Sequence, residues 1–229
     1  TPATGDNCGV ASVSNNAPAS YPVGNTTVTW TVTDVNGNST TTTQVVTVKD
    51  NQAPTVRVNN VTVTLVNGSA SVNAAQINNG SSDNCGIQSV VLSGKMNYSC
   101  ADIGQHTVTL TVTDIHGNVA SANAVVTVAG VIPAASITAI PSNSTYTGGV
   151  PTNLYLGYGP QSLTLQVNAT GGAPYSYSWT GNGSLNSTTA SSPVFTATVA
   201  GNYTFVVTVT NVNGCTTTAR VSICVRDIR

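Results

Sequence analysis

Charged residues are scarce in this 229-residue sequence. Asp, Glu, Lys and Arg make up 6% of it, and all seven acidic residues are Asp, whereas a typical soluble domain is roughly one quarter charged. The six basic residues stand apart from one another, and the net charge is −1. Binding to nucleic acid or to an anionic membrane surface requires clustered Lys and Arg, so we expect neither as a partner.

Long apolar runs and helical periodicity are also missing. The sequence contains no run of about 18 apolar residues that would cross a bilayer, so we expect no membrane insertion. No segment repeats its apolar residues at intervals of three and four, and the abundant Thr, Val, Asn and Gly are mediocre or poor helix formers. We therefore expect almost no helix.

Ser, Thr and Asn replace charge as the source of solubility. Ser and Thr together number 60 and Asn numbers 25, which predicts a surface of hydroxyl and amide groups. The five Cys residues fit an oxidising compartment better than the cytosol, and their odd number leaves at least one thiol without a partner inside the chain. We therefore expect the protein to be extracellular or at the cell surface.

The most informative feature is an internal repeat. Thr31–Asn38 (TVTDVNGN) recurs as Thr111–Asn118 (TVTDIHGN) and more loosely as Thr208–Gly214. Upstream, Asp6–Val10 (DNCGV) recurs as Asp83–Ile87 (DNCGI). Both motifs return after roughly 80 residues, a period that indicates tandem copies of one structural unit.

Each copy predicts a β-hairpin. In the first copy, Val28, Trp30 and Val32 alternate with threonines, which is the period of a strand with one buried face. The dipeptides that follow the three strands are Asn36-Gly37, His116-Gly117 and Asn213-Gly214. Such pairs supply the positive φ values that tight hairpin turns require. The sequence therefore predicts an all-β protein.

Two proline-containing segments mark the domain boundaries. They follow the ends of predicted strands, at Asp50–Pro54 and Val131–Ala134, and proline favours an extended join. We expect three units, at residues 1–51, 52–130 and 131–229. The first has few residues before its Asp6–Val10 motif, so we expect it to lack its N-terminal strands and to be completed by strands from outside this sequence.

Four segments of the first unit carry a family resemblance: Asp6–Gly9, Tyr21–Gly24, Val28–Asp34 and Asp50–Pro54. Together they resemble a hyalin-repeat (HYR) module, and the second unit, with Cys85 and Cys100, is similar. In HYR modules cysteines at such places commonly pair, so the resemblance implies a Cys85–Cys100 disulfide.

The third unit resembles a PKD-type domain through Gly171–Trp179 and Ala200–Tyr203. The combined resemblance implies tandem immunoglobulin-like β-sandwich domains with an adhesive or spacer role, and it does not imply catalysis. Cys215 and Cys224 lie nine residues apart, and at about 3.3 Å per extended residue they bond only if the chain folds back. Cys8 has no partner in its own unit.

The carboxylates gather near the predicted domain edges, each within a few residues of Asn. The candidate calcium ligands among them are Asp34, Asp50, Asp83 and Asp114. Calcium binds six to eight oxygens of carboxylates, amides and carbonyls, and such a site would stiffen a domain join. The alternative is turn chemistry, because Asp and Asn also bond to their own backbone in turns. The small number of carboxylates in each group favours turns, and no other cofactor is expected.

The residues that could carry chemistry have structural interpretations. Trp30 and Trp179 could stack on sugars, but Trp30 is in phase with Val28 and Val32, and Trp179 lies where a sandwich buries its central tryptophan, so we expect both in the core. Tyr203 suits a tyrosine corner, in which the hydroxyl bonds to nearby backbone. His106 and His116 do not recur in the sister repeats. No nucleophile with a paired base and no zinc-like Cys and His spacing is present, so we expect no catalytic residues and no enzyme.

Eleven Asn-x-Ser/Thr sequons fall in predicted turns, strand ends or outward strand positions, where a glycan could reach solvent. They begin at Asn25, Asn38, Asn60, Asn67, Asn79, Asn97, Asn143, Asn168, Asn182, Asn186 and Asn202. Covalent glycans are therefore candidate modifications.

Two functions compete on these observations. The first is a structural component of an extracellular fibre, stalk or adhesin shaft, whose partners are other copies or flanking repeats of the same protein, arranged head to tail. The alternative is a carbohydrate- or protein-binding accessory module of a secreted adhesin or enzyme. Tyr155, Tyr158, Tyr175 and Tyr177 are the one concentration of rings that could support binding.

Overall fold

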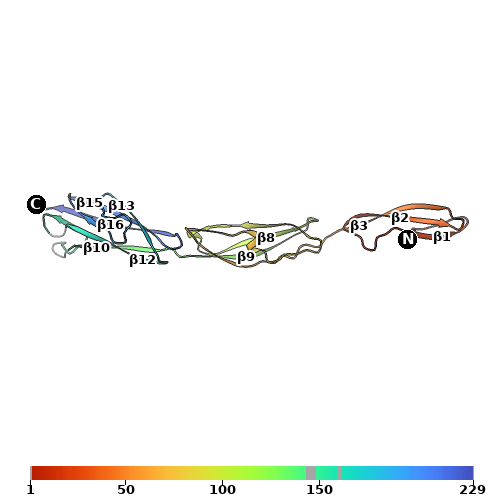
Figure 1. The fold of residues 1–229 in the computed structure, drawn as a ribbon, viewed down its shortest axis with the longest axis horizontal. Coiled ribbons are helices and arrows are strands. Elements are labelled where there is room, and N and C mark those ends of the chain that lie inside the picture. Colours follow the sequence, from red (N-terminus) through yellow and green to blue (C-terminus); the bar gives the residue numbers. More distant parts are fainter. Residues whose placement is uncertain (1, 143–147, 159–160, 229) are drawn as a thin grey trace. The chain divides into compact units, whose positions relative to one another are not determined.

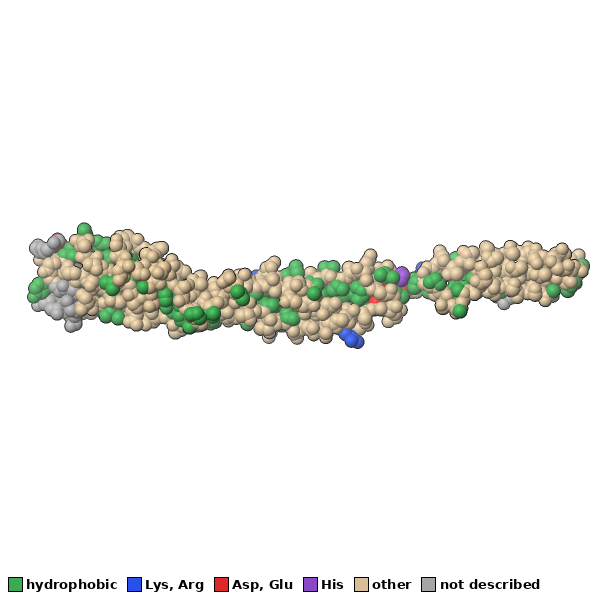
Figure 2. Space-filling model, viewed as in Figure 1, with side chains coloured by type: hydrophobic (Ala, Val, Ile, Leu, Met, Phe, Trp, Pro, Cys, Tyr) green, Lys and Arg blue, Asp and Glu red, His purple; other side chains and the backbone are tan. Residues whose placement is uncertain are grey.

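The computed structural model describes residues 2–142, 148–158 and 161–228, and the regular secondary structure of these residues is almost all β-strand (Figure 1). The all-β, immunoglobulin-like sandwich class is therefore confirmed. Helix in the described residues is limited to the single turn α1 (Ala74–Ile77) and the 3-10 turn η1 (Cys100–Asp102). None of the described helices is long and apolar enough to cross a membrane. The face drawn in Figure 2 carries few charged side chains.

The first sheet is an antiparallel meander of β1 (Val10–Asn15), β2 (Gly24–Asp34) and β3 (Ser39–Val48). Val28 is the one buried residue among these three strands. Trp30 is half-buried, and its Nε1 donates to Gln44 Oε1 at 3.1 Å. The prediction that Trp30 is buried is wrong, because alternation shows which face a residue lies on and not whether that face is covered.

The second region contains two sheets. The larger has the order β4-β9-β8-β6, and the smaller pairs β5 with β7. The strands are β4 (Val61–Thr64), β5 (Ser69–Ser71), β6 (Ile87–Gly94), β7 (Asn97–Ser99), β8 (Gly104–Asp114) and β9 (Val119–Ala129). Val108, Leu110 and Val112 of β8 are buried, which confirms the period-two pattern. Strand β4 pairs with β9 in parallel.

The third region is a sandwich of two sheets, with the orders β10-β12-β14 and β11-β16-β15-β13. The strands are β10 (Ala134–Pro141), β11 (Asn153–Leu156), β12 (Ser162–Thr170), β13 (Ser176–Gly181), β14 (Val194–Thr196), β15 (Gly201–Thr210) and β16 (Thr216–Asp227). Trp179 is 4% exposed, as predicted, and belongs to the core between them. Its Nε1 donates to Ala190 O at 2.9 Å. The Tyr203 hydroxyl donates to Val199 O at 3.0 Å, which confirms the tyrosine corner.

The chain forms two compact units. The first comprises Thr1–Thr55, Ser82–Ser89 and Val112–Ala120. The second comprises Val56–Ser81, Val90–Thr111 and Ser121–Arg229. The division at residues 1–51, 52–130 and 131–229 stays a prediction. Each of the two sites described below lies inside one compact unit.

Candidate functional site

The same five-residue turn closes the main hairpin of each repeat. Its first backbone N–H donates to the carbonyl of its fifth residue, at 2.9 Å in Asp34–Asn38, 3.0 Å in Asp114–Asn118 and 3.0 Å in Asn211–Cys215. The first side chain accepts two backbone N–H groups of its own turn through Oδ1, with distances of 2.8–2.9 Å for Asp34, 2.8 Å for Asp114 and 3.0–3.1 Å for Asn211. Asp34 and Asp114 thus make the hydrogen bonds to their own turn backbone that the sequence suggested.

Each turn also contacts an upstream glycine loop. The second residue of the turn donates its N–H to Gly9 O at 3.2 Å, to Gly86 O at 3.2 Å and to Gly172 O at 3.1 Å in the three copies. These contacts fix which residues correspond between copies. Three positions before the glycine stand Asp6, Asp83 and Ala169.

In the second copy three carboxylates meet. Asp50, Asp83 and Asp114 each place an oxygen within 4.8 Å of the other two. The Asp50 side chain is 3% exposed and Asp114 is fully buried. The Oδ2 atoms of Asp50 and Asp83 are buried and accept no hydrogen bond from the described residues. We call these three residues the carboxylate cluster.

Asp34 does not join this group. Its carboxylate bonds to Asn36 and Asn38 of its own turn, and the groups of potential metal ligands in the described residues do not include it. The Asn38 side chain lowers the pKa of Asp34; burial opposes this effect, and backbone N–H groups of the turn reinforce it. Of the four predicted calcium ligands, three gather and Asp34 lies elsewhere.

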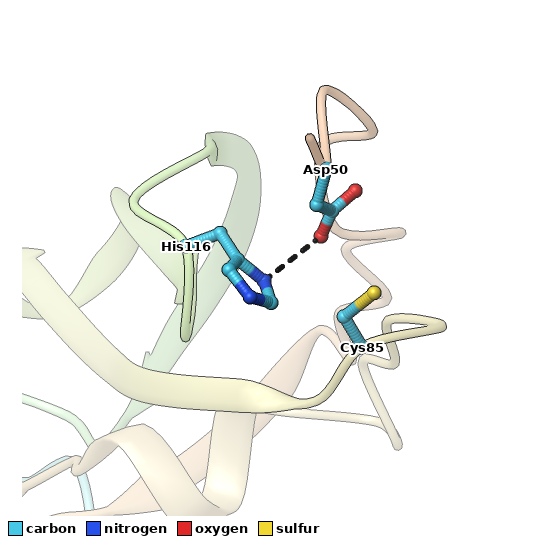
Figure 3. A group of neighbouring side chains, drawn as sticks. All are labelled: Asp50, Cys85 and His116. Atoms are coloured by element: carbon cyan, nitrogen blue, oxygen red, sulfur yellow. Dashed lines mark ion pairs between the residues drawn. The ribbon is translucent and has the colours of Figure 1, made fainter. Parts of the chain in front are cut away.

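Cys85 and His116 adjoin the cluster through Asp50, as Figure 3 shows. His116 Nδ1 lies 3.2 Å from Asp50 Oδ2. A hydrogen bond to Asp50 raises the pKa of the Cys85 thiol, and burial and the charges of the three carboxylates raise it further. A raised pKa keeps the thiol protonated, whereas a nucleophilic cysteine requires the thiolate. Sequence reasoning missed both residues, although their positions beside Asp83 and Asp114 in the repeated motifs were a usable signal.

Asp114 is ionised more readily than a free aspartate. Burial acts to raise its pKa, but hydrogen bonds from the Asn118 side chain and from backbone N–H groups of the turn outweigh burial and lower the pKa overall. The Asn118 amide also donates to Asp50 O at 3.3 Å. The turn therefore ties the segment that carries Asp50 to the second repeat.

The disulfide differs from the predicted one. Cys100 bonds to Cys215, 115 residues away, with a Cα–Cα distance of 5.6 Å. The predicted Cys85–Cys100 pairing is wrong, because Cys85 belongs to the first compact unit beside Asp50 while Cys100 lies in η1 of the second unit. Cys8, Cys85 and Cys224 carry free thiols.

Hydrogen bonds surround the disulfide and form a joint, which we call the disulfide joint. Gly68 N donates to Asn213 O at 2.7 Å, and Asn213 Nδ2 donates to Leu65 O at 3.2 Å. Cys215 is fully buried and stands where the other two turns have Asn38 and Asn118. The third hairpin turn is therefore fastened to the second repeat by a covalent bond and by backbone contacts.

The described sequon asparagines are exposed, and two of the predicted tyrosines pack at the edge of a core. Ten sequon asparagines are exposed and Asn143 lies outside the described residues; their glycosylation stays a prediction. Tyr175 and Tyr177 pack against the core of the third sandwich, and Tyr158 is 52% exposed.

No family model matches the chain, and no curated protein matches it. Among solved structures, the chain is similar to mouse clustered PcdhgC3 EC1-3, with 12% identity, a TM-score of 0.34, and coverage of 91% of this chain and 78% of that one. The match to PcdhgB3 EC1-4 has 12% identity and a TM-score of 0.35, over 90% of this chain and 58% of that one.

A bacterial structure gives a match of the same quality. BT4661, a SusE-like surface-located polysaccharide-binding protein from the Bacteroides thetaiotaomicron heparin utilisation locus, has 9% identity and a TM-score of 0.32 over 95% of this chain and 54% of that one. The chain thus spans little more than half of PcdhgB3 EC1-4 and of BT4661. Similarities this low carry no argument about what the chain binds or does.

Proposed function

We propose that the chain is a structural segment of an extracellular fibre, stalk or adhesin shaft assembled end to end from HYR-like and PKD-like immunoglobulin-like modules. The observation that carries the proposal is the disulfide joint. Cys100 precedes the predicted boundary at Val131 and Cys215 follows it, so with this division the bond would link two successive modules. A segment that transmits force along its length needs joints that do not open.

The covalent bond also supports the location. Disulfides persist in oxidising compartments such as the cell exterior and are rare in the cytosol. The low charge and the ten exposed sequon asparagines suit a protein whose solubility rests on neutral polar groups and on attached glycans. The proposed location is the cell surface or the extracellular space.

The first sheet supports end-to-end partners. Its three strands bury one residue, Val28, while Val13 is 37% exposed and Val45 is 58% exposed. Sheet faces and edges left open in this way favour pairing with further strands. The proposed partners are other copies or flanking repeats of the same protein, which supply strands by β-strand addition.

Electron microscopy of the protein released from its native surface tests the proposal. We expect fibres or stalks with a regular axial repeat, into whose density the module pair joined by the disulfide fits as one body. Discrete particles without axial repeat, or a soluble enzyme complex that contains the chain, would overturn it.

A second measurement isolates the joint. When the oxidised chain is pulled in a single-molecule experiment, the disulfide should prevent the residues between Cys100 and Cys215 from extending, even after both modules unfold. Reduction should release about 400 Å of extra length, because the 115-residue separation extends by about 3.3–3.6 Å per residue. If the modules of the oxidised chain unfold at forces no higher than those of the reduced chain, the joint has no mechanical role.

A further inference from the structure

The segments that lead into the second and third repeats contact corresponding positions, but these positions hold carboxylates in one case and neutral residues in the other. The turn contacts to Gly86 and Gly172 align Asp114 with Asn211 and Asp83 with Ala169. The hairpin repeat aligns Asp50, in the segment before the second repeat, with Gly130 before the third. The positions of the three carboxylates in the second repeat are therefore held by neutral residues in the third.

The third repeat shows what this position requires. Asn211 Nδ2 donates to Val131 O at 2.7 Å and to Gly171 O at 3.0 Å. The Asn211 amide thus links three elements: its own turn, the glycine loop at Gly171 and the segment at Val131 that leads into the repeat. In the second repeat the same three elements contribute Asp114, Asp83 and Asp50, and an ionised carboxylate only accepts hydrogen bonds.

The carboxylate cluster has no lysine or arginine partner among the described residues, although it is largely buried. Like charges close together in a site shielded from water repel strongly, and buried charges are paired or coordinate metals. The Asp50 side chain is 3% exposed, and its Oδ2 atom has Nδ1 of the His116 ring 3.2 Å away but accepts no hydrogen bond from the described residues. The buried Oδ2 of Asp83 accepts none from them either.

We infer that Asp50, Asp83 and Asp114 bind a calcium ion that ties the segment carrying Asp50 to the second repeat. Calcium ligands lie about 2.3–2.6 Å from the ion, so two oxygens that share it are at most about 5 Å apart. The cluster oxygens lie within 4.8 Å of one another. Carboxylate oxygens are hard donors, which suit calcium.

Zinc is the competing ion, because Cys85 and His116 offer sulfur and nitrogen beside Asp50. Cys85 and His116 group with one carboxylate, Asp50, whereas Asp50 groups with two further carboxylates, Asp83 and Asp114. The buried Oδ2 of Asp83, which accepts no hydrogen bond from the described residues, belongs to the all-carboxylate group. These observations favour the oxygen-bound ion.

The chain supplies a matched pair of variants for the test. Asp114→Asn and Asp34→Asn make the same change at the same position of two corresponding turns. Asn211 shows that asparagine supports this type of turn with the same two backbone hydrogen bonds. Asp34 lies outside the cluster, so its variant controls for the substitution itself. Asp50→Asn is the second cluster variant.

The experiment is calorimetric titration of the full chain with CaCl₂ after chelation, followed by thermal melts with CaCl₂ or EDTA. We expect one calcium per chain with a Kd on the order of 10⁻⁴–10⁻³ M, as in extracellular modules, and a higher melting temperature with calcium. Asp34→Asn should bind like the unmodified chain, and Asp114→Asn and Asp50→Asn should bind at least tenfold more weakly. Circular dichroism checks that each variant is folded.

Three results would overturn the site. The first is no calcium binding by the unmodified chain at 10 mM or below, a ceiling about tenfold above the weakest of these constants. The second is equal binding by Asp114→Asn, Asp50→Asn and Asp34→Asn. The third is zinc binding that Cys85→Ser abolishes, in a chain that does not bind calcium.

Discussion

The disulfide joint contains a close backbone contact that a single methyl group tests. A Cβ placed on Gly214 would lie 2.3 Å from Gly68 N and 2.4 Å from Asn67 C. Both are backbone atoms, so no side chain can turn aside. Gly214 also has a φ of +81°, which L residues adopt with strain. Gly214→Ala should therefore strain its own turn and force the joint apart.

The magnitude follows from two contributions. The left-handed conformation costs an L residue about 1–2 kcal/mol, and overpacking costs about 1–3 kcal/mol more. We expect Gly214→Ala to lower the free energy of unfolding by about 2–5 kcal/mol. Gly149 has a φ of +76° in the same compact unit and no atom of the described residues within 4 Å of its Cβ position, so Gly149→Ala should show the first contribution alone.

The assay has two readouts. Urea denaturation with the disulfide intact measures the free energy of unfolding of both variants. The rate at which a soluble thiol reduces the Cys100–Cys215 bond measures opening of the joint, because Cys215 is fully buried. Gly214→Ala should accelerate reduction and Gly149→Ala should not. Equal destabilisation by the two variants, with equal reduction rates, would refute the close contact.

Three further predictions concern the disulfide, acid stability and the tryptophans. Replacing Cys100 and Cys215 by Ser should lower the free energy of unfolding in urea by about 2–5 kcal/mol, since the bond constrains a 115-residue loop of the unfolded chain; an unchanged midpoint would contradict this. The Lys95 side chain, with Ser99, holds the pKa of Asp102 at about 2, below its ordinary 3.8, so the stability it provides is present above about pH 4 and is lost as pH falls towards 2. Lys95→Met should lessen that acid-dependent loss in melts between pH 5 and 2, and an unaltered pH profile would count against the ion pair. Acrylamide should quench part of the tryptophan fluorescence, and Trp30→Phe should remove the quenchable part; if quenching persists in that variant, the exposure of Trp30 is misassigned.

The local features of the fold could be predicted from the sequence. Alternation of valine with threonine specifies a strand with one buried face, and Asn-Gly and His-Gly pairs specify tight turns. The hairpins whose turns begin at Asp34 and Asp114 were therefore predictable. The tyrosine corner of Tyr203 was also predictable, because it too is a local feature: the acceptor of its hydroxyl, Val199 O, is four residues away. Coverage of a sheet face depends on distant segments, and the prediction for Trp30 failed on that point.

The cysteines and the carboxylate cluster depended on tertiary structure. Cys100 and Cys215 are separated by 115 residues, and nothing in the spacing of the cysteines indicates their pairing. The candidate carboxylates Asp50, Asp83 and Asp114 were identified, but Asp34 has the same turn chemistry as Asp114. Only the folded chain shows which of these turns has a further carboxylate beside it.

The parallel pairing of β4 with β9 determines how the second module would respond to tension. Val61 pairs with Val126 and Val63 with Val128, and both strands run in one direction. A pull on the segment before β4 and the segment after β9 therefore draws the two strands past each other lengthwise. Their hydrogen bonds lie across the direction of pull and must break together, whereas bonds between hairpin strands peeled apart from one end break one at a time. The ladder between β4 and β9 is thus a shear clamp that resists stretching of the module.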